Sequence, residues 1–173
     1  MRIEFAGGYV RPWLPGDVPA LTRLADSRAV WRNLRDAFPN PYSKKDARTW
    51  IRAVTRQFPC QHFAIIVEEG PAVLAGGIGV IPGSDVHAGT AEIGYWLGEA
   101  YWGRGIMTAA LSAFTEFAWA EFRLRRLYAH VLEWNPASMR VLEKCDYVAE
   151  GRLRKSAWKD GAVADEILYA RVV

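Results

Sequence analysis

Two glycines stand where a strand-like run gives way to a long helix with an apolar stripe. The segment reads Trp102, Gly103, Arg104, Gly105, Ile106, Met107 and Thr108, and it contains no acid. A helix start carries backbone N–H groups without intrahelical partners and the positive end of the helix dipole. Because glycine has no Cβ, the chain can approach a pyrophosphate closely there. The segment therefore predicts a site for a phosphate-bearing ligand. Arg104 and Thr108 would contact its phosphates. The alternative is that Arg104 is a solvent-exposed arginine and Thr108 an ordinary residue of the first helical turn.

A second polar group, Asn135 and Ser138, lies at the start of a short helix. Asn135 precedes Pro136, which is the usual pattern of an N-cap followed by the first helical residue. By itself this pattern favours a cap for Asn135 and a surface hydroxyl for Ser138. A hydroxyl in this position can also donate a proton to a leaving group. Both interpretations stay open at this point.

Glu92 lies in the strand that precedes the glycine segment. A carboxylate on a strand that lines a cleft can take a proton from an ammonium group through water. A shift of one residue would place Glu92 on the other face of the sheet, so a solvated glutamate is the alternative. Tyr95 and Tyr101 could donate a proton, but aromatic residues in such places more often form a wall.

The remaining reactive side chains indicate neither a metal site nor a nucleophile. His62, His87 and His130 lack the spacing of metal ligands, and His130 fits a structural histidine better than a catalytic one. Cys145 has no base nearby in the sequence and fits a buried thiol. The glycines at 76, 77 and 79 lie inside a strand that no helix follows, so they are not a dinucleotide-binding fingerprint.

The elements that position these residues follow from hydrophobic periodicity and turn signals. Helices are expected over residues 18–25, 29–35, 44–57, 107–122 and 136–144, and strands over 9–14, 62–68, 73–81, 91–97, 126–133, 147–158 and 163–171. Asp17 is predicted to cap the first helix, and Ser43 with Asp46 to form a capping box. The strand at 126–133 follows a crossover helix and should pair in parallel with 91–97. The order of elements predicts an α/β fold with a mixed sheet.

Composition sets broad limits. A chain of 173 residues suits a single domain, 1–173. Its net charge of +3 would help attract a polyanionic ligand but does not indicate nucleic-acid binding. No apolar run is long enough for a membrane span and the N-terminus lacks a secretory pattern, so we expect a cytoplasmic protein without a membrane partner. The eight tryptophans would suit a large pocket or an oligomer interface, such as that of a homodimer.

In these motifs and their order, the chain resembles the GNAT N-acetyltransferases, and among them the ribosomal-protein (RimJ/RimL-type) branch. The resemblance covers nearly the whole chain and rests on residues 91–97, 101–108, 135–138, 143–144 and 150–151. It implies a GNAT fold, with a mixed, mostly antiparallel central sheet, a splayed parallel strand pair and flanking helices. Three residues depart from the family pattern. Trp102 replaces Gln or Arg, Met107 replaces a small residue and could narrow the approach to the pyrophosphate, and Asp146 replaces Gly.

The resemblance implies acetyl-CoA as the donor substrate, without a metal. It implies transfer of the acetyl group to a primary amine, on a protein N-terminus or a small molecule, by direct attack in a ternary complex. A non-catalytic module that binds CoA or acyl-CoA is the alternative. The residues that would bind the donor are Tyr95, Trp96 and Leu97 through their main chain, the segment from Trp102 to Thr108, Asn135 and Ser138.

The same resemblance assigns the catalytic and acceptor sides. Ser138 becomes the candidate proton donor to the thiolate, and Glu92 the candidate general base. The acceptor wall would combine the loop 33–42, the turn 159–164 and four tryptophans, Trp31, Trp50, Trp134 and Trp158. A cationic acceptor would need acids, and Asp36 and Glu133 are the evident ones.

Overall fold

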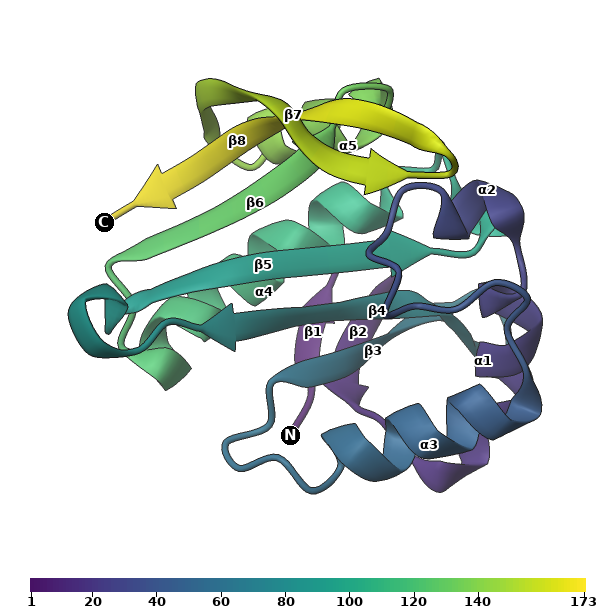
Figure 1. The fold of residues 1–173 in the computed structure, drawn as a ribbon. Coiled ribbons are helices and arrows are strands. Elements are labelled where there is room, and N and C mark those ends of the chain that lie inside the picture. The colour runs from purple at the N-terminus through teal and green to yellow at the C-terminus, as the bar shows by residue number, and fades with distance from the viewer. The chain divides into compact units, whose positions relative to one another are not determined.

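The computed structural model describes all 173 residues of the chain (Figure 1). The helices are α1 (Val18–Ala25), α2 (Arg28–Trp31), α3 (Lys44–Val54), α4 (Ile106–Phe122) and α5 (Pro136–Glu143), with 3₁₀ turns η1 (Pro15–Asp17), η2 (Asp85–His87) and η3 (Glu99–Tyr101). The strands are β1 (Ile3–Phe5), β2 (Gly8–Pro12), β3 (His62–Glu68), β4 (Ala72–Pro82), β5 (Thr90–Leu97), β6 (Arg126–Leu132), β7 (Val148–Lys159) and β8 (Ala162–Val172). None of the helices is long and apolar enough to cross a membrane.

The strands form one mixed sheet in the order β1-β2-β3-β4-β5-β6-β8-β7. Strands β5 and β6 pair in parallel, as their connection through α4 predicts. Antiparallel pairing joins β1 to β2, β2 to β3, β3 to β4, β6 to β8 and β7 to β8. The expected fold class is confirmed. The parallel ladder runs from Thr90 opposite Arg126 to Glu92 opposite Tyr128, and both strands continue beyond it.

The N-terminal elements differ from the expectation. A β1–β2 hairpin replaces the single strand expected at 9–14, with Gly7 at φ 89° in its turn. Three residues are too few for β1 to show an alternating pattern. The helix expected at 29–35 is a single turn, α2. After it the Asn33 amide donates to the carbonyl of Ala29 at 3.0 Å and the Asn33 N–H to that of Val30 at 3.1 Å.

Asp17 does not cap α1 with its side chain, so that prediction is wrong. Asp17 occupies the N-cap position, but no side-chain cap bond forms there. Its carboxylate accepts two hydrogen bonds from Arg11, at 2.7 and 2.8 Å, and a third from the N–H of Leu14 at 2.8 Å. The Asp17 carboxylate thus binds Arg11, six residues earlier in the sequence, instead of the N–H groups of α1 that the local pattern predicted.

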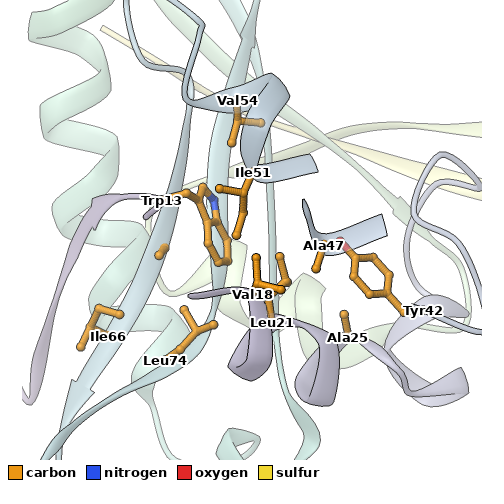
Figure 2. Packing of buried hydrophobic residues seen from close by; sticks show 11 residues of the cluster. Trp13, Val18, Leu21, Ala25, Tyr42, Ala47, Ile51, Val54, Ile66 and Leu74 are labelled. Carbon is orange, nitrogen blue, oxygen red and sulfur yellow. The ribbon is translucent and has the colours of Figure 1, made fainter. Parts of the chain in front are cut away.

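The chain packs as two compact units, residues 1–79 with 95–114, and residues 80–94 with 115–173. In the first unit, α1 and α3 close a buried cluster over one face of β3 and β4 (Figure 2). The cluster comprises Trp13, Val18, Leu21, Ala25, Tyr42, Ala47, Ile51, Val54, Ala64, Ile66 and Leu74. On the other face of β3, the ring of Phe63 meets that of Phe114 in α4, with centroids 5.2 Å apart.

In the second unit, one face of β5, β6 and β8 is buried. Its members alternate along each strand, and they include Ala91, Ile93, Leu127, Ala129 and Tyr169. Deep in the same unit, the hydroxyls of Thr115 and Tyr147 lie 2.9 Å apart, and burial raises the pKa of Tyr147 to about 12. The opposite face of these strands leaves Gly94 and His130 exposed.

The capping box of α3 is confirmed, and it yields a stability prediction. The Ser43 hydroxyl accepts from the Asp46 N–H at 3.2 Å, and the Asp46 carboxylate accepts from the Ser43 N–H at 2.8 Å. Hydrogen bonds from the Ser43 hydroxyl and N–H hold the pKa of Asp46 below its usual value. Ser43→Ala should lower the thermal midpoint by about 3 °C, measured by circular dichroism. Ser43→Thr keeps the hydroxyl and should melt with the wild type. If Ser43→Ala had the same thermal midpoint as the wild type, the capping box would not contribute to stability.

Candidate active site

The glycine segment lies in the first unit, between η3 and α4. Gly103 and Gly105 have φ of 71° and 74°, in the left-handed region that favours glycine, and a Cβ added at either would meet no atom within 4 Å. The indole N–H of Trp102 donates to the carbonyl of Leu97 at 2.8 Å, which ties the segment to the end of β5. Helix α4 starts at Ile106, so the N–H groups of its first turn lie beyond the reach of helical carbonyls. Open space, glycine backbone and N–H donors at a helix start are what binding of a phosphate requires.

Two side chains of this segment have definite partners. The side chain of Met107 is buried in the core with 7% exposure, so it does not cover the two glycines. Arg104 forms an ion pair with Glu69 in the β3–β4 turn, and its guanidinium lies 5.7 Å from the centroid of the Tyr101 ring. A phosphate that bound Arg104 would have to compete with Glu69.

The end of β5 packs closely on β4, and the glycines of β4 make this possible. A Cβ at Gly76 would lie 2.1 Å from the carbonyl oxygen of Trp96, and one at Gly77 would lie 2.9 Å from its indole nitrogen. This close approach explains the glycines at 76 and 77, in keeping with their not being a dinucleotide-binding fingerprint. The ring of Phe38, in the loop 33–42, meets the Trp96 ring edge-on at 5.4 Å. This contact brings the loop expected on the acceptor side next to β5.

Glu92 and His130 meet in the second unit, although 38 residues separate them in the sequence. The Glu92 Oε1 lies 3.2 Å from the His130 Nδ1, and the two side chains are 18% and 29% exposed. The parallel register sets Glu92 opposite Tyr128, so His130, two residues further along β6, projects from the same face. Sequence reasoning gave His130 a structural role. The alternation of buried and exposed residues along β6, combined with the correct register to β5, could have predicted this pair.

Asn135 caps α5. Its Oδ1 accepts from the N–H of Ser138 at 3.2 Å, which is the interpretation that the sequence favoured without the family resemblance. The cap uses only Oδ1, so the Asn135 side-chain NH₂ remains available in chemical terms for a second role. Ser138 lies in the first turn of this short helix and is partly buried. The cap therefore fixes the backbone that carries the Ser138 hydroxyl.

Asp146 adopts the conformation that the family glycine would have. Its φ is 63°, in the left-handed region, and its carboxylate lies 3.9 Å from the guanidinium of Arg171. Aspartate tolerates this conformation better than most residues. The departure from the family pattern thus leaves the turn after α5 intact.

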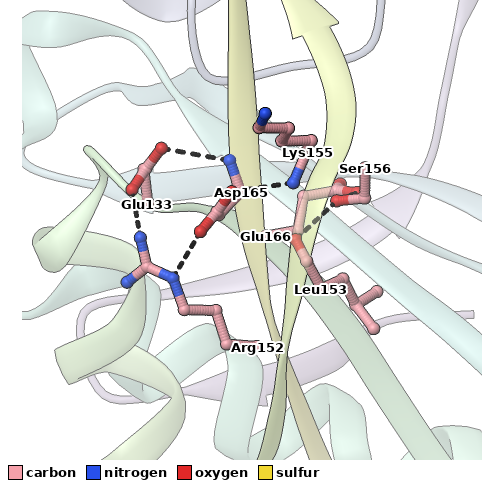
Figure 3. A network of polar contacts seen from close by, with 7 residues as sticks. All are labelled: Glu133, Arg152, Leu153, Lys155, Ser156, Asp165 and Glu166. Carbon is pink, nitrogen blue, oxygen red and sulfur yellow. Dashed lines mark hydrogen bonds and ion pairs between the residues drawn. The ribbon is translucent and has the colours of Figure 1, made fainter.

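The β7–β8 hairpin is held by a network of charged groups (Figure 3). Arg152 bridges Asp165, with Nε–Oδ2 at 2.5 Å, and Glu133. The N–H of Lys155 donates to Asp165 at 2.8 Å, and the N–H of Asp165 to Glu133 at 3.0 Å. Lys155 has φ 53° within a register shift of β7 between Leu153 and Ala157. The hydrogen bonds from the Lys155 N–H and from Arg152 lower the pKa of Asp165. Glu133, considered for a cationic acceptor, is therefore bonded to Arg152.

A separate cavity in the first unit contains none of the predicted site residues. It measures about 270 Å³ and is lined by Pro12, Trp13, Val54, Thr55, Gln57, Cys60 and His62. Burial lowers the pKa of His62 and raises that of Cys60. The histidine is therefore neutral near pH 7 and the thiol protonated, so this cavity lacks an activated nucleophile. Trp50, expected in the acceptor wall, packs edge-on against His62 at 4.9 Å. No group of three or more potential metal ligands occurs in the structure.

The fold is that of known acetyltransferases. A RimL ribosomal L7/L12 alpha-N-protein acetyltransferase, solved in complex with coenzyme A, superposes with a TM-score of 0.87 and 23% identity, over 100% of this chain and 98% of that one. At this identity the likeness concerns the fold alone.

Curated relatives match part of the chain. The probable N-acetyltransferase YjcK of Bacillus subtilis (strain 168) is 42% identical over 81 residues, 47% of this chain and 45% of that protein. The ribosomal-protein-serine acetyltransferase of Escherichia coli (strain K12) is 37% identical over 84 residues, 49% of this chain and 47% of that protein. The chain thus matches about half the length of these relatives.

The family profile described as acetyltransferase (GNAT) domain matches residues 9–148. This range takes in the glycine segment, the parallel strand pair and the start of α5. It also covers well over half of the chain. The protein therefore belongs to the GNAT acetyltransferase family.

Proposed function

We propose that this protein transfers an acetyl group from acetyl-CoA to a primary amine by direct attack in a ternary complex. The observation that carries the proposal is the glycine segment of a GNAT chain, with two open left-handed glycines just before a long helix. The N–H groups around Gly103, Gly105 and Ile106 bind the pyrophosphate, and Arg104 and Thr108 add contacts to it. Trp102 holds the segment in place through its bond to Leu97.

The remaining donor contacts follow the family pattern. The main chain of Tyr95, Trp96 and Leu97 binds the pantetheine arm as an added strand would, and the Asn135 amide adds a contact. An N–H of β5 stabilises the negative charge that develops on the carbonyl oxygen. Acetyl-CoA supplies an activated acyl group, because a thiolate is a good leaving group.

The acceptor nitrogen loses two protons in the reaction. The acceptor ammonium first loses a proton to a base, and the neutral nitrogen forms the new N–C bond as the C–S bond breaks. Ser138 donates its proton to the thiolate and regains one from the nitrogen, which loses its second proton, and the base returns the first proton to solvent. Glu92 and its contact partner His130 are the titratable groups in the second unit that suit the role of the base.

A protein N-terminus is the acceptor to test first. The Escherichia coli relative is named a ribosomal-protein-serine acetyltransferase, and the superposing RimL is named for the N-terminus of ribosomal L7/L12. Small amines are the second class to test. We further propose that the enzyme acts as a single GNAT domain in the cytoplasm, and as a homodimer.

The test has two measurements. Calorimetry should detect binding of acetyl-CoA, and thiol release should detect turnover with a panel of N-terminal peptides, amino acids and polyamines. Binding with turnover supports the enzyme, whereas binding without turnover on any acceptor would favour a non-catalytic CoA-binding module. Absence of binding at high micromolar acetyl-CoA would contradict both.

The Arg104–Glu69 pair gives a prediction about donor affinity. Glu69→Gln removes the competing carboxylate, so affinity for CoA should rise about twofold to fivefold by calorimetry. The control is Glu68→Gln at the neighbouring residue, whose carboxylate pairs with Arg2 at 2.8 Å, and its affinity should not change. An unchanged affinity in Glu69→Gln would remove Arg104 from the phosphate site.

A further inference from the structure

We propose that His130 is the general base of the transfer and that Glu92 is a positioning residue that orients it. This inference rests on the proposed acetyltransferase function and reverses the assignment drawn from sequence. It starts from one contact, the 3.2 Å between the Glu92 Oε1 and the His130 Nδ1. The two groups come from neighbouring parallel strands, just where the β5–β6 ladder ends.

The contact fixes which ring nitrogen carries the proton. An ionised carboxylate only accepts hydrogen bonds, so the His130 Nδ1 must donate. In the neutral ring the Nε2 then holds a lone pair, and this nitrogen can take a proton from an ammonium group. When the proton arrives, the carboxylate stabilises the imidazolium. A carboxylate that orients a catalytic histidine in this way acts without being protonated itself.

The surroundings of His130 leave room for an amine. Its face of the sheet also carries Gly94, which is exposed although β5 is an interior strand, and a Cβ there would meet no atom within 4 Å. The opposite face is buried, as Ala91, Ile93 and Ala129 show. The missing side chain at Gly94 therefore leaves open space on the same face as the pair.

The described neighbours of His130 include one charged group that contacts it, Glu92. The Tyr128 ring stands edge-on to the imidazole, 5.7 Å between centroids at 83°. On β8 the partner of His130 is Leu168, which is apolar. Arg126, the first residue of β6, is paired with Glu150 at 2.7 Å, so its charge is compensated. In this setting the carboxylate is the group that orients and polarises the ring.

The proton balance is simple. The R–NH₃⁺ acceptor gives one proton to the His130 Nε2 and becomes R–NH₂, whose lone pair forms the bond to the acetyl carbon. The C–S bond breaks as the N–C bond forms, and the second proton of the nitrogen reaches the thiolate through Ser138, which gives free CoA. His130 then releases the first proton to solvent and is again neutral. No oxidant, metal or further reactant enters the step.

Kinetics over a pH range separate the two candidate bases. In the wild type, kcat/KM should rise with pH as the base loses its proton. His130→Gln should lower kcat/KM about 10²-fold and abolish this rise. Glu92→Gln should lower kcat/KM about tenfold and keep the rise with pH, because the base itself is still present and only its orientation is lost. His87→Gln, at an exposed histidine in η2, is the matched control and should behave as wild type.

A rise that survives in His130→Gln and disappears in Glu92→Gln would make Glu92 the base and overturn the proposal. So would a His130→Gln variant with unchanged rates. His130→Asn serves as a second variant, and CoA affinity and thermal melting check that each variant is folded.

A spectroscopic measurement tests the pair without turnover. The chain has three histidines, so ¹⁵N spectra of the rings can be assigned with single variants. In the wild type the neutral His130 ring should be the Nδ1–H tautomer, and Glu92→Ala should shift it towards Nε2–H. An Nε2–H tautomer in the wild type would overturn the proposal. Absence of turnover with every acceptor would instead count against the acetyltransferase function, and the tautomer would still decide the arrangement of the pair.

Discussion

We expect replacement of Gly105 with glutamate to abolish binding of coenzyme A. The backbone at Gly105 has φ 74°, which a side chain strains, and the space beyond it is open. The new carboxylate would enter the place proposed for the pyrophosphate and repel it. Displacement of the phosphates from the backbone N–H groups, together with the repulsion, should weaken binding at least about 100-fold, measured by calorimetry with CoA.

Two variants control for strain alone. Gly7 also has a positive φ, 89°, and open space around it, but it lies in the β1–β2 turn. Gly7→Glu should therefore bind CoA as the wild type does. Gly105→Ala introduces the strain without the charge and should give an intermediate affinity. Retention of affinity in Gly105→Glu would mean that the phosphates bind elsewhere.

Ser138→Ala should lower kcat about 10²-fold while leaving the affinity for CoA unchanged, because it removes the proposed proton donor to the thiolate. The alanine variant keeps the backbone N–H of residue 138, which donates to the Asn135 Oδ1 at 3.2 Å, so the start of α5 should stay intact. Steady-state thiol release with the best acceptor gives kcat, and calorimetry gives the affinity.

Ser112→Ala is the control for this variant, because Ser112 is an exposed serine on α4 outside the proposed site. Its kcat should equal that of the wild type. If the rates of Ser138→Ala and Ser112→Ala coincide, Ser138 has no part in proton transfer.

The interior strands and α4 were predictable because their signals are local. Strand β3 has the expected bounds, and β4, β5 and β6 differ from expectation by one residue at their ends. The apolar spacing of α4 and its position between two strands predicted the parallel pair as well. Three-residue strands and single-turn helices, such as β1 and α2, carry too few residues for such signals.

The sequence could predict which side chains belong to the candidate site, but it predicted poorly which groups those side chains contact. The carboxylate of Asp17 could cap a helix or bind an arginine, and the position of Arg11 decided between them. The sequence suggested that Glu133 could bind a cationic acceptor, but its carboxylate accepts hydrogen bonds from Arg152 and from the Asp165 N–H. In both cases the partner lies on a different element of the fold, and sequence spacing does not give the distance between the two side chains.

The sequence by itself determined the family, the mixed sheet and the glycine segment, because periodicity, turn chemistry and helix-start patterns act over a few residues. Only the tertiary structure decided that Glu92 faces His130 and that Met107 turns into the core. The reason is register: one residue of slip between β5 and β6 would send Glu92 to the buried face and break the pair. Register is a property of two strands distant in the sequence, so patterns within either strand do not determine it.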